Sequence, residues 1–217
     1  SVQAPNSAPA ESYRSLRTSI QFVGIQRAPR IIQVTSAHAG EGKTATVSNL
    51  GVALARSGQR TVLVDCDLRR GRLHTFFDLK NDVGFTSLYL DEETVATAAT
   101  PIADVKNLSV VPCGPIPPNP SEILSDKRTG EVLATLLETC DVVLVDCPPV
   151  LPVSDPAALS VWVEATILVV SSGVTRKQDV QRAVEILLQG DAPLVGTVLN
   201  NVRPQDEYAY ASSYYHD

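Results

Sequence analysis

The sequence has no methionine, one tryptophan and four cysteines among its 217 residues, and aromatic residues make up 5% of it. No apolar run approaches the roughly 20 residues that a helix needs to cross a bilayer. We therefore expect no membrane-spanning segment within these residues. Because the first residue is Ser1 and not methionine, we interpret the sequence as a piece of a longer protein.

The cysteines are too scattered to form a metal site. Cys66, Cys113, Cys140 and Cys147 include no CxxC pair, and the sequence has three histidines. Zinc sites need ligands at short, defined spacings, so a zinc protein is excluded. We expect four reduced thiols, as is usual in cytosolic proteins.

Positive charge is also in short supply. Lysine and arginine number 18 against 24 acidic residues, which gives a formal net charge of −6. Binding to nucleic acid depends on cationic side chains that replace counterions, so we expect no nucleic-acid partner. The 44% apolar and 19% charged residues are typical of a globular domain with a sizeable core.

What the sequence does contain is a series of short runs rich in Val, Ile and Leu, separated by helical patterns. The runs are nearly continuous and do not alternate with polar residues, which is typical of strands buried on both faces of a parallel sheet. Strands that alternate with helices predict an α/β fold with a doubly wound, mostly parallel sheet flanked by helices. The expected strands are 30–36, 61–65, 108–113, 141–146, 165–172 and 194–200, and the expected helices are 11–26, 43–58, 121–138, 155–162 and 176–189.

The ends of the sequence differ in composition from its middle. Residues 1–10 are small, polar and proline-containing, and we interpret them as a linker. Residues 11–203 form the predicted domain. Residues 204–217 are polar, lack periodicity and hold four of the six tyrosines, so we expect a flexible tail.

Residues 36–45, SAHAGEGKTA, lie between an expected strand and an expected helix. Ala37-x-x-x-x-Gly42-Lys43-Thr44 fits a P-loop, with alanine in the first glycine position. In such a loop Lys43 reaches the β- and γ-phosphates of ATP, and the Thr44 hydroxyl binds Mg²⁺. The phosphate-binding loop would comprise Ala39, Gly40, Glu41, Gly42, Lys43, Thr44 and Ala45.

A dinucleotide-binding turn is the main alternative. Gly40-x-Gly42-x-x-Ala45 satisfies that fingerprint, and Asp65 follows about 20 residues later, where a ribose-binding acid belongs. This alternative, which would make the chain a nicotinamide-dependent oxidoreductase, gives no role to a lysine and a hydroxyl directly after the second glycine. A bare structural turn is the third possibility. The P-loop is favoured.

Three aspartates follow two of the expected strands. Asp65 and Asp67 end one of them, and Asp146 ends another in a Walker B pattern. Strand ends at one edge of an α/β sheet converge on the ligand, so we expect these acids to hold Mg²⁺ and to accept a proton. A turn or helix cap is the structural alternative for each aspartate. Arg69 could pair with a carboxylate or a phosphate, and Arg70 and Arg72 are expected to form a solvated basic edge.

Several segments together carry a resemblance to a known family. SAHAGEGKT, VLVDCDLR and VVLVDCPPV, together with the tyrosine-rich tail, resemble the cytoplasmic catalytic domain of the bacterial tyrosine kinases, which belong to the chain-length regulators of capsular and exopolysaccharide export. GPIPPNPSEIL (114–124) resembles a family segment, and ESYRSLRTSI (11–20) resembles its ExxRxxR oligomerisation motif. The resemblance implies a P-loop NTPase fold of the deviant-Walker, partitioning-ATPase-like kind.

The resemblance implies roles for particular residues. Lys43, Asp65, Asp67 and Asp146 would be catalytic, and Thr44 with the three aspartates would bind Mg²⁺. Glu11, Arg14 and Arg17, which a helical wheel places opposite Leu16 and Ile20, would face outward and join subunits into a ring. The tail tyrosines would be phosphorylated, largely by a neighbouring subunit: Tyr208, Tyr210, Tyr214 and Tyr215.

The resemblance also implies partners and a location. The domain would act at the cytoplasmic side of the bacterial membrane, with a membrane-spanning regulator segment or adaptor and a cognate tyrosine phosphatase. Asn200, at the end of the last expected strand, is our candidate for binding the adenine. The sequence departs from the family pattern at Ala39 and Gly71, where proline is usual, and at Thr44, where serine is frequent. The related partitioning ATPases carry a lysine where this sequence has His38, which weakens the alternative of a non-kinase ATPase switch.

Overall fold

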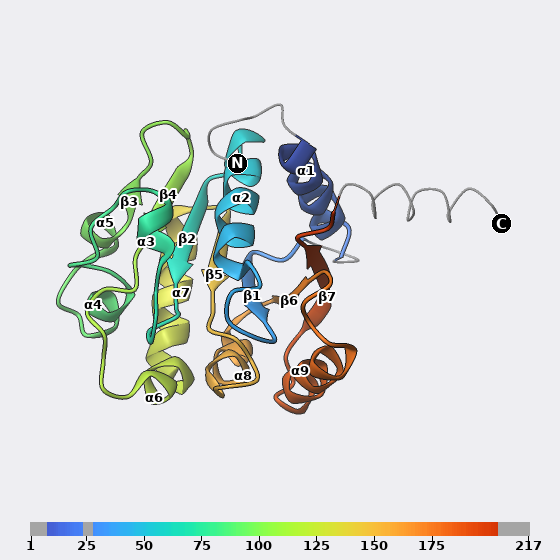
Figure 1. The fold of residues 1–217 in the computed structure, drawn as a ribbon. Helices are drawn as coiled ribbons and strands as arrows, with labels where there is room; N and C mark the ends of the chain where they lie inside the picture. The colour runs from blue at the N-terminus through green and yellow to red at the C-terminus, as the bar shows by residue number, and fades with distance from the viewer. Residues whose placement is uncertain (1–7, 24–27, 204–217) are drawn as a thin grey trace.

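The computed structural model describes residues 8–23 and 28–203. These residues form a seven-stranded sheet between two layers of helices, with the strand order β3-β4-β2-β5-β1-β6-β7 (Figure 1). Neighbouring strands are parallel apart from the β3–β4 pair, which confirms the predicted fold class. The strands are β1 (Ile31–Ser36), β2 (Thr61–Asp65), β3 (Thr100–Pro101), β4 (Leu108–Val111), β5 (Val142–Asp146), β6 (Ala165–Ser171) and β7 (Leu194–Asn200).

All six predicted strands are present, and their ends lie close to the expected positions. The strand expected over 108–113 ends at Val111, because Pro112 has no N–H to donate to the sheet. β3 was not predicted: it has two residues, pairs antiparallel with β4, and is too short to show a pattern.

The helices follow the prediction less closely. The first helix begins at Ala8, inside the segment interpreted as a linker, and ends at Gln21. The helix expected over 121–138 is two helices, because the Asp126 carboxylate accepts a hydrogen bond from Arg128 N at 2.8 Å and starts a new helix. The helices are α1 (Ala8–Gln21), α2 (Lys43–Arg56), α3 (Leu73–Phe76), α4 (Phe85–Tyr89), α5 (Val95–Ala98), α6 (Pro120–Ser125), α7 (Lys127–Thr139), α8 (Asp155–Leu159), the 3₁₀ turn η1 (Ser160–Trp162) and α9 (Lys177–Gln189).

The helices cover both faces of the sheet. α1 and α2 pack over one face, in a cluster that includes Leu50, Leu63 and Leu144. α4, α6, α7 and α8 pack over the other, around Leu133 and Val145, and α9 covers β6 through a smaller cluster. Figure 1 shows α2 in front of the sheet and α7 behind it. Because both faces are covered, the strands are buried and apolar throughout.

α2 lies very close to the sheet. A Cβ added to Gly51 would stand 2.4 Å from Leu63 Cδ2, so a larger residue does not fit there. Leu50, which is fully buried beside it, contributes about 1.5–3 kcal/mol by leaving water. This packing fixes the helix, and with it the loop that precedes the helix.

The sheet register brings three segments to one edge. Asp146 in β5 pairs with Val34 in β1 on one side and with Asp65 in β2 on the other. The loop after β1 and the aspartates after β2 and β5 therefore meet at the carboxyl ends of adjacent strands, where α/β sheets bind ligands.

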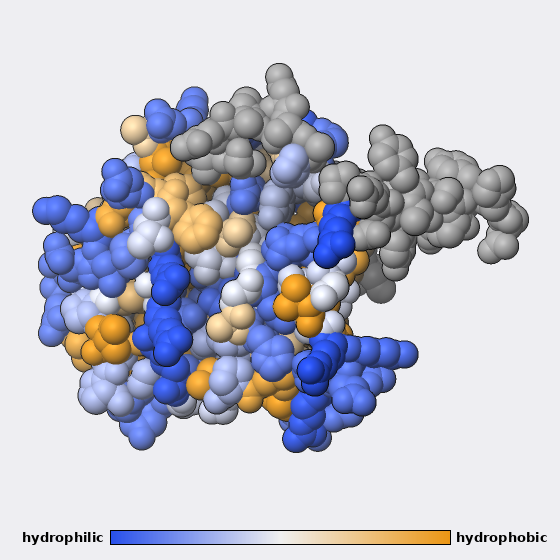
Figure 2. All heavy atoms as spheres, viewed as in Figure 1, coloured by the Kyte–Doolittle hydropathy of each residue, from blue (hydrophilic) through white to orange (hydrophobic). Residues whose placement is uncertain are grey.

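The surface seen in Figure 2 is mostly hydrophilic, with several separate apolar patches. Over the ranges 8–23 and 28–203, no helix has both the length and the apolar character needed to cross a bilayer.

Candidate functional site

The loop between β1 and α2 has the backbone of a phosphate cradle. Gly40 and Gly42 have φ angles of 84° and 96°, a left-handed conformation that glycine adopts without steric cost. A Cβ on Gly42 would stand 2.0 Å from Asn200 Nδ2. α2 begins at Lys43 without a side-chain cap. The N–H groups of its first turn have no partner within the helix and favour an anion.

Glu41 braces this loop from inside. Its buried carboxylate accepts hydrogen bonds from His38 N at 3.0 Å and from Thr175 Oγ1 at 2.5 Å. Asn200 Nδ2 donates to Glu41 O at 3.0 Å. The Glu41 side chain and the Asn200 amide thus hold the loop in shape. The adenine contact predicted for Asn200 stays a prediction.

Lys43 lies between two carboxylates at the opening of α2. Its Nζ is 2.9 Å from Asp67 Oδ2 and 3.7 Å from Asp146 Oδ1, and the side chain is 12% exposed. Burial works against the charge on Lys43, but Asp146 and Asp67 outweigh burial and raise the pKa of Lys43. Lys43 is therefore a charged ammonium. A phosphate bound at the loop would take the place of its two carboxylate partners.

Asp65 is held by backbone N–H groups of the segment that follows β2. Its carboxylate accepts hydrogen bonds from Asp67 N at 3.1 Å and from Leu73 N at 2.9 Å, and the residue is fully buried. Burial, followed by the nearby charge of Asp146, raises the pKa of Asp65 to about 8. In this position Asp65 shapes the loop after β2, and its predicted roles in metal binding and catalysis stay predictions.

Asp146 and Thr44 form a compact oxygen pair. Thr44 Oγ1 donates to Asp146 Oδ2 at 2.6 Å, whereas Asp146 Oδ1 is buried without a hydrogen-bond partner in the described part of the chain. Burial raises the pKa of Asp146 to about 6, against the opposing effects of Lys43 and Thr44. A buried carboxylate oxygen that accepts no hydrogen bond from the described residues, beside a hydroxyl, is a donor set that suits Mg²⁺.

The three predicted acids do not gather around one point. The described residues hold no group of three or more His, Cys, Asp or Glu side chains arranged to hold a metal ion. Mg²⁺ at this edge would therefore need oxygens from Thr44 and from a ligand besides Asp146.

A cleft of about 640 Å³ opens beside the loop, and we call it the Lys43 cleft. Six of the eight predicted binding residues line it, whereas Glu41 and Asn200 do not, and of the three acids Asp67 does. Its lining comprises Ala39, Gly40, Gly42, Lys43, Thr44, Ala45, Asp67, Arg69, Arg70, Arg72, Phe76, Pro148, Pro149, Pro152 and Val153.

Asp155 is a site residue that the sequence analysis missed. It is fully buried, and its carboxylate accepts from Arg69 Nε at 2.8 Å and from Ser121 Oγ at 2.6 Å. Arg69 therefore pairs with a carboxylate, one of the two predicted possibilities. The pattern Ser-Asp-Pro, which places an acid at a helix start, was the available signal. Arg70 and Arg72 are exposed, as predicted.

The charged residues of α1 do not all face outward, which corrects the prediction. Glu11 and Arg14 are paired on the exposed side of the helix. Arg17 instead turns toward α2, where its Nη1 donates to Ala53 O at 3.4 Å. A helical wheel does not include the neighbouring helix, and α2 covers the side on which Arg17 lies. The four tail tyrosines lie outside the described residues.

The four cysteines are free and buried. Cys66 and Cys147 each follow a site aspartate, and burial raises the pKa of both thiols well above its ordinary value. Both are therefore protonated and weakly reactive.

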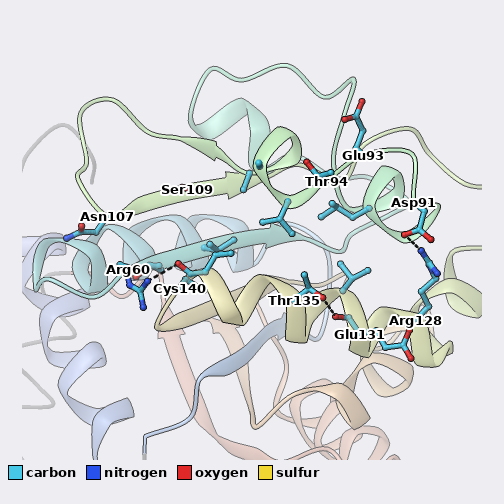
Figure 3. Close-up of a pocket in the computed structure, with 18 residues that line it drawn as sticks. Arg60, Asp91, Glu93, Thr94, Asn107, Ser109, Arg128, Glu131, Thr135 and Cys140 are labelled. Atoms are coloured by element: carbon cyan, nitrogen blue, oxygen red, sulfur yellow. Dashed lines mark hydrogen bonds and ion pairs between the residues drawn. The ribbon is translucent and has the colours of Figure 1, made fainter.

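A second hollow, larger than the Lys43 cleft, lies near the amino ends of β2 and β4. This Arg60 cavity measures about 920 Å³. Figure 3 shows Arg60 and Cys140 at one end of it and the paired Arg128 and Asp91 at the other. Its lining also includes the apolar side chains of Val62, Leu88 and Val132. It contains no part of the P-loop, so the two hollows are separate.

Comparisons with known proteins agree with this geometry. A family model described as "AAA domain" matches residues 29–177. Tyrosine-protein kinase YwqD of Bacillus subtilis is 38% identical over 208 residues, which cover 95% of this chain and 87% of that protein. Tyrosine-protein kinase Wzc of Salmonella typhi is 32% identical over 93% of this chain, and the match spans 28% of Wzc.

Solved structures give the same answer. The kinase domain of Escherichia coli tyrosine kinase ETK superposes with a TM-score of 0.88 and 31% identity, covering 93% of this chain and 78% of that one. The septum site-determining protein MinD of Pyrococcus horikoshii, solved with Mg-ADP, has a TM-score of 0.66 and 22% identity over 82% of this chain and 75% of its own, which shows a shared fold. With its P-loop, its strand-end aspartates and these relatives, the chain belongs to the AAA-domain family and, within it, to the bacterial tyrosine kinases.

Proposed function

We propose that this domain is an autokinase that transfers the γ-phosphoryl group of ATP to its own tail tyrosines, Tyr208, Tyr210, Tyr214 and Tyr215. The observation that carries the proposal is the buried Lys43 ammonium between Asp67 and Asp146, at the start of a helix whose first N–H groups are free to bind phosphate. A dinucleotide-binding turn, the main alternative from the sequence, gives no role to a lysine at this position.

Lys43 would move from its acid partners to the triphosphate. Its Nζ is held at 2.9 Å by Asp67, so a phosphate oxygen that enters the Lys43 cleft exchanges one anionic partner for another. The N–H groups from Ala39 to Ala45 would hold the remaining phosphate oxygens, with the helix dipole of α2 behind them. The phosphates would then be fixed in line with an acceptor, and positioning is the main part of catalysis in phosphoryl transfer.

The residues present fit a magnesium ion. Thr44 Oγ1 and Asp146 Oδ1, which accepts no hydrogen bond from the described residues, would hold it. Bound there, Mg²⁺ supplies neutralisation of the charge on the phosphoryl oxygens.

Asp67 would accept the tyrosine proton. A phenol has a pKa near 10 and is neutral at pH 7, so its proton must leave as the new bond forms. Of the three predicted acids, Asp67 lines the Lys43 cleft, and Arg70 N fixes its Oδ1 at 3.0 Å. Asp65 would act through its hold on the Asp67 backbone.

The assembly and its setting form part of the proposal. Subunits would form a ring through the α1 motif, with exposed Glu11 and Arg14 at the contact and Arg17 stabilising α1 on α2. Phosphorylated tails, each carrying added negative charge, would disassemble it. The domain would work at the cytoplasmic side of the bacterial membrane with a membrane-spanning regulator segment or adaptor, oppose a cognate tyrosine phosphatase, and regulate polysaccharide polymerisation and export.

The test is incubation of the full chain, with its membrane partner segment, with labelled ATP and Mg²⁺. We expect label on the protein, its loss when all four tail tyrosines are changed to phenylalanine, and mapped phosphates on residues 208–215. Label that survives the four substitutions rejects the proposal, as does an absence of label.

The alternative is an ATPase switch that dimerises on binding ATP and transfers no phosphate to protein. The fold shared with MinD favours it. ATP-dependent dimerisation together with an unmodified tail would select this alternative.

A further inference from the structure

The Lys43 cleft has a second wall besides the P-loop. It consists of basic side chains from the loop after β2 and of apolar side chains from α3 and the loop after β5. Phe76 lines the cleft and is 46% exposed. Pro152 is exposed and Val153 half-buried beside it. An aromatic ring that entered here would remove these groups from water.

Of the three arginines in this wall, Arg69 is paired with a carboxylate. Arg69 is tied to buried Asp155 by two hydrogen bonds, from Nε at 2.8 Å and from a terminal nitrogen at 3.1 Å. The exposed side chains of Arg70 and Arg72 have no ion pair within the described residues. Their guanidinium groups therefore remain available to an acidic ligand.

The backbone under these arginines is rigid. Arg70 N donates to Asp67 Oδ1 at 3.0 Å, and Arg72 O accepts from Thr75 Oγ1 at 2.8 Å. Arg70 is thus fixed to Asp67, the carboxylate that lines the cleft, and Arg72 is fixed to α3. A ligand that engages the two arginines is held at a defined distance from the phosphoryl-transfer site.

The sequence contains a segment with matching chemistry. Asp206 and Glu207 directly precede Tyr208, whereas two serines directly precede Tyr214. An aromatic ring next to two carboxylates complements an apolar surface next to two exposed arginines.

We propose that Phe76, Arg70 and Arg72 form an acceptor subsite that selects tyrosines preceded by acidic residues, and that Tyr208 is therefore phosphorylated before Tyr214. This inference rests on the proposed function, because it concerns the acceptor of the same reaction. Phe76 contributes to every acceptor tyrosine by covering the ring. Arg70 and Arg72 contribute to those with acidic residues on the amino-terminal side.

The experiment measures initial phosphorylation rates at Tyr208 and Tyr214 within the same full-length chain, by quantitative mass spectrometry after Mg²⁺-ATP addition. The ratio of the two rates cancels any change in ATP binding or in the fraction of folded protein. Two exposed ion pairs together alter an equilibrium by about fivefold to tenfold. We expect a ratio of about that size in favour of Tyr208.

Four variants and one control carry the test. Arg70→Gln/Arg72→Gln and Asp206→Asn/Glu207→Gln should each bring the ratio to within about twofold of unity, and their combination should lower it no further, since both remove the same contact. Phe76→Ala should slow both tyrosines and leave the ratio unchanged. Lys106→Gln/Arg182→Gln, which removes two exposed positive charges elsewhere, is the matched control and should keep the full ratio.

The outcomes separate this inference from the proposed function. A ratio near unity in the unchanged chain overturns the inference, as does a ratio that the Arg70→Gln/Arg72→Gln variant retains. Additive effects of the arginine and acid substitutions also overturn it, because they would mean that the two pairs act separately. A wild-type chain whose tail stays unmodified fails the proposed function itself.

Discussion

The Lys43 cleft is smaller than the Arg60 cavity, and the two hollows also differ in the chemistry of the residues that line them. The Arg60 cavity is larger, about 920 Å³ against about 640 Å³, but Arg60 is already paired with Asp141. Arg128 is paired with Asp91, as Figure 3 shows. In the Lys43 cleft, the exposed Arg70 and Arg72 have no ion pair among the residues that the structure describes, and beside the cleft Asp146 Oδ1 has no hydrogen bond to any of them. These polar groups, more than volume, make the Lys43 cleft the candidate site.

The position of each hollow on the sheet explains the difference. The Lys43 cleft lies at the carboxyl ends of β1, β2 and β5, where the loops carry polar side chains toward one point. The Arg60 cavity lies near the amino ends of β2 and β4, where short α4 and α5 leave the sheet face incompletely covered. The Lys43 cleft thus results from the strand order of the sheet, whereas the Arg60 cavity results from helices too short to cover the sheet.

The largest effect is expected from removal of the ammonium. Lys43→Ala takes away the positive charge that Asp67 and Asp146 share and that the phosphates need. We expect tail phosphorylation to fall by about 10²-fold to 10³-fold, measured as initial incorporation of labelled phosphate. The circular dichroism spectrum should be unchanged, and activity within tenfold of the wild type would contradict the assigned role.

A pair of glycines gives the next test. Gly42 and Gly58 have similar φ angles of 96° and 100°, but a Cβ on Gly42 would strike Asn200 whereas one on Gly58 would meet nothing within 4 Å. Gly58→Ala should cost about 1 kcal/mol of unfolding free energy and leave ATP affinity unchanged. Gly42→Ala should also weaken ATP binding by about tenfold or more, measured by calorimetry.

Equal ATP affinities for the two alanine variants would show that the contact between Gly42 and Asn200 does not shape the phosphate cradle.

Filling each hollow compares the two directly. Ala99→Leu adds apolar volume to the Arg60 cavity and should leave tail phosphorylation unchanged, with unfolding free energy within about 1 kcal/mol of the wild type. Val153→Phe narrows the Lys43 cleft and should slow phosphorylation by about tenfold. If Ala99→Leu lost activity while its denaturation curve stayed like that of the wild type, the two hollows would be coupled.

The smallest effect is expected at the rim of the Arg60 cavity. The hydrogen bonds from Arg60 lower the pKa of Asp141, so the folded state holds this carboxylate ionised more tightly than the unfolded state does. Its stabilisation is present at pH 7 and is lost as the pH falls through the lowered pKa, below the ordinary value of 3.8. Because both side chains are largely exposed, Asp141→Asn should lower the melting temperature by at most about 2 °C at pH 7, and by less at pH 3.

Sequence patterns located the strands well and the intervening short elements poorly. Runs such as Val142–Asp146 are apolar throughout because helices cover both faces, and that signal is strong. Between β2 and β4, α3 to α5 have four or five residues each, which is barely one turn and too short for a periodic pattern. Packing against the sheet, and not local preference, stabilises them.

The candidate site was predictable where chemistry follows the chain and less so where it depends on contacts. Lys43 and Thr44 lie where the motif places them, beside Asp67 and Asp146. The different positions of Asp65 and Asp67 were not foreseen, because both follow the same strand and the direction of each side chain is set by the loop. The inward turn of Arg17 and the pairing of Arg69 with Asp155 depend on partners distant in sequence.

The two-residue strand β3 has a consequence for the protein in concentrated solution. β3 is the edge strand on one side of the sheet and consists of Thr100 and Pro101. Proline has no amide hydrogen that could bond to an added strand. A foreign strand that approached this border would find almost no ladder to extend. We therefore expect no aggregation by strand pairing at the β3 edge, even at high protein concentration.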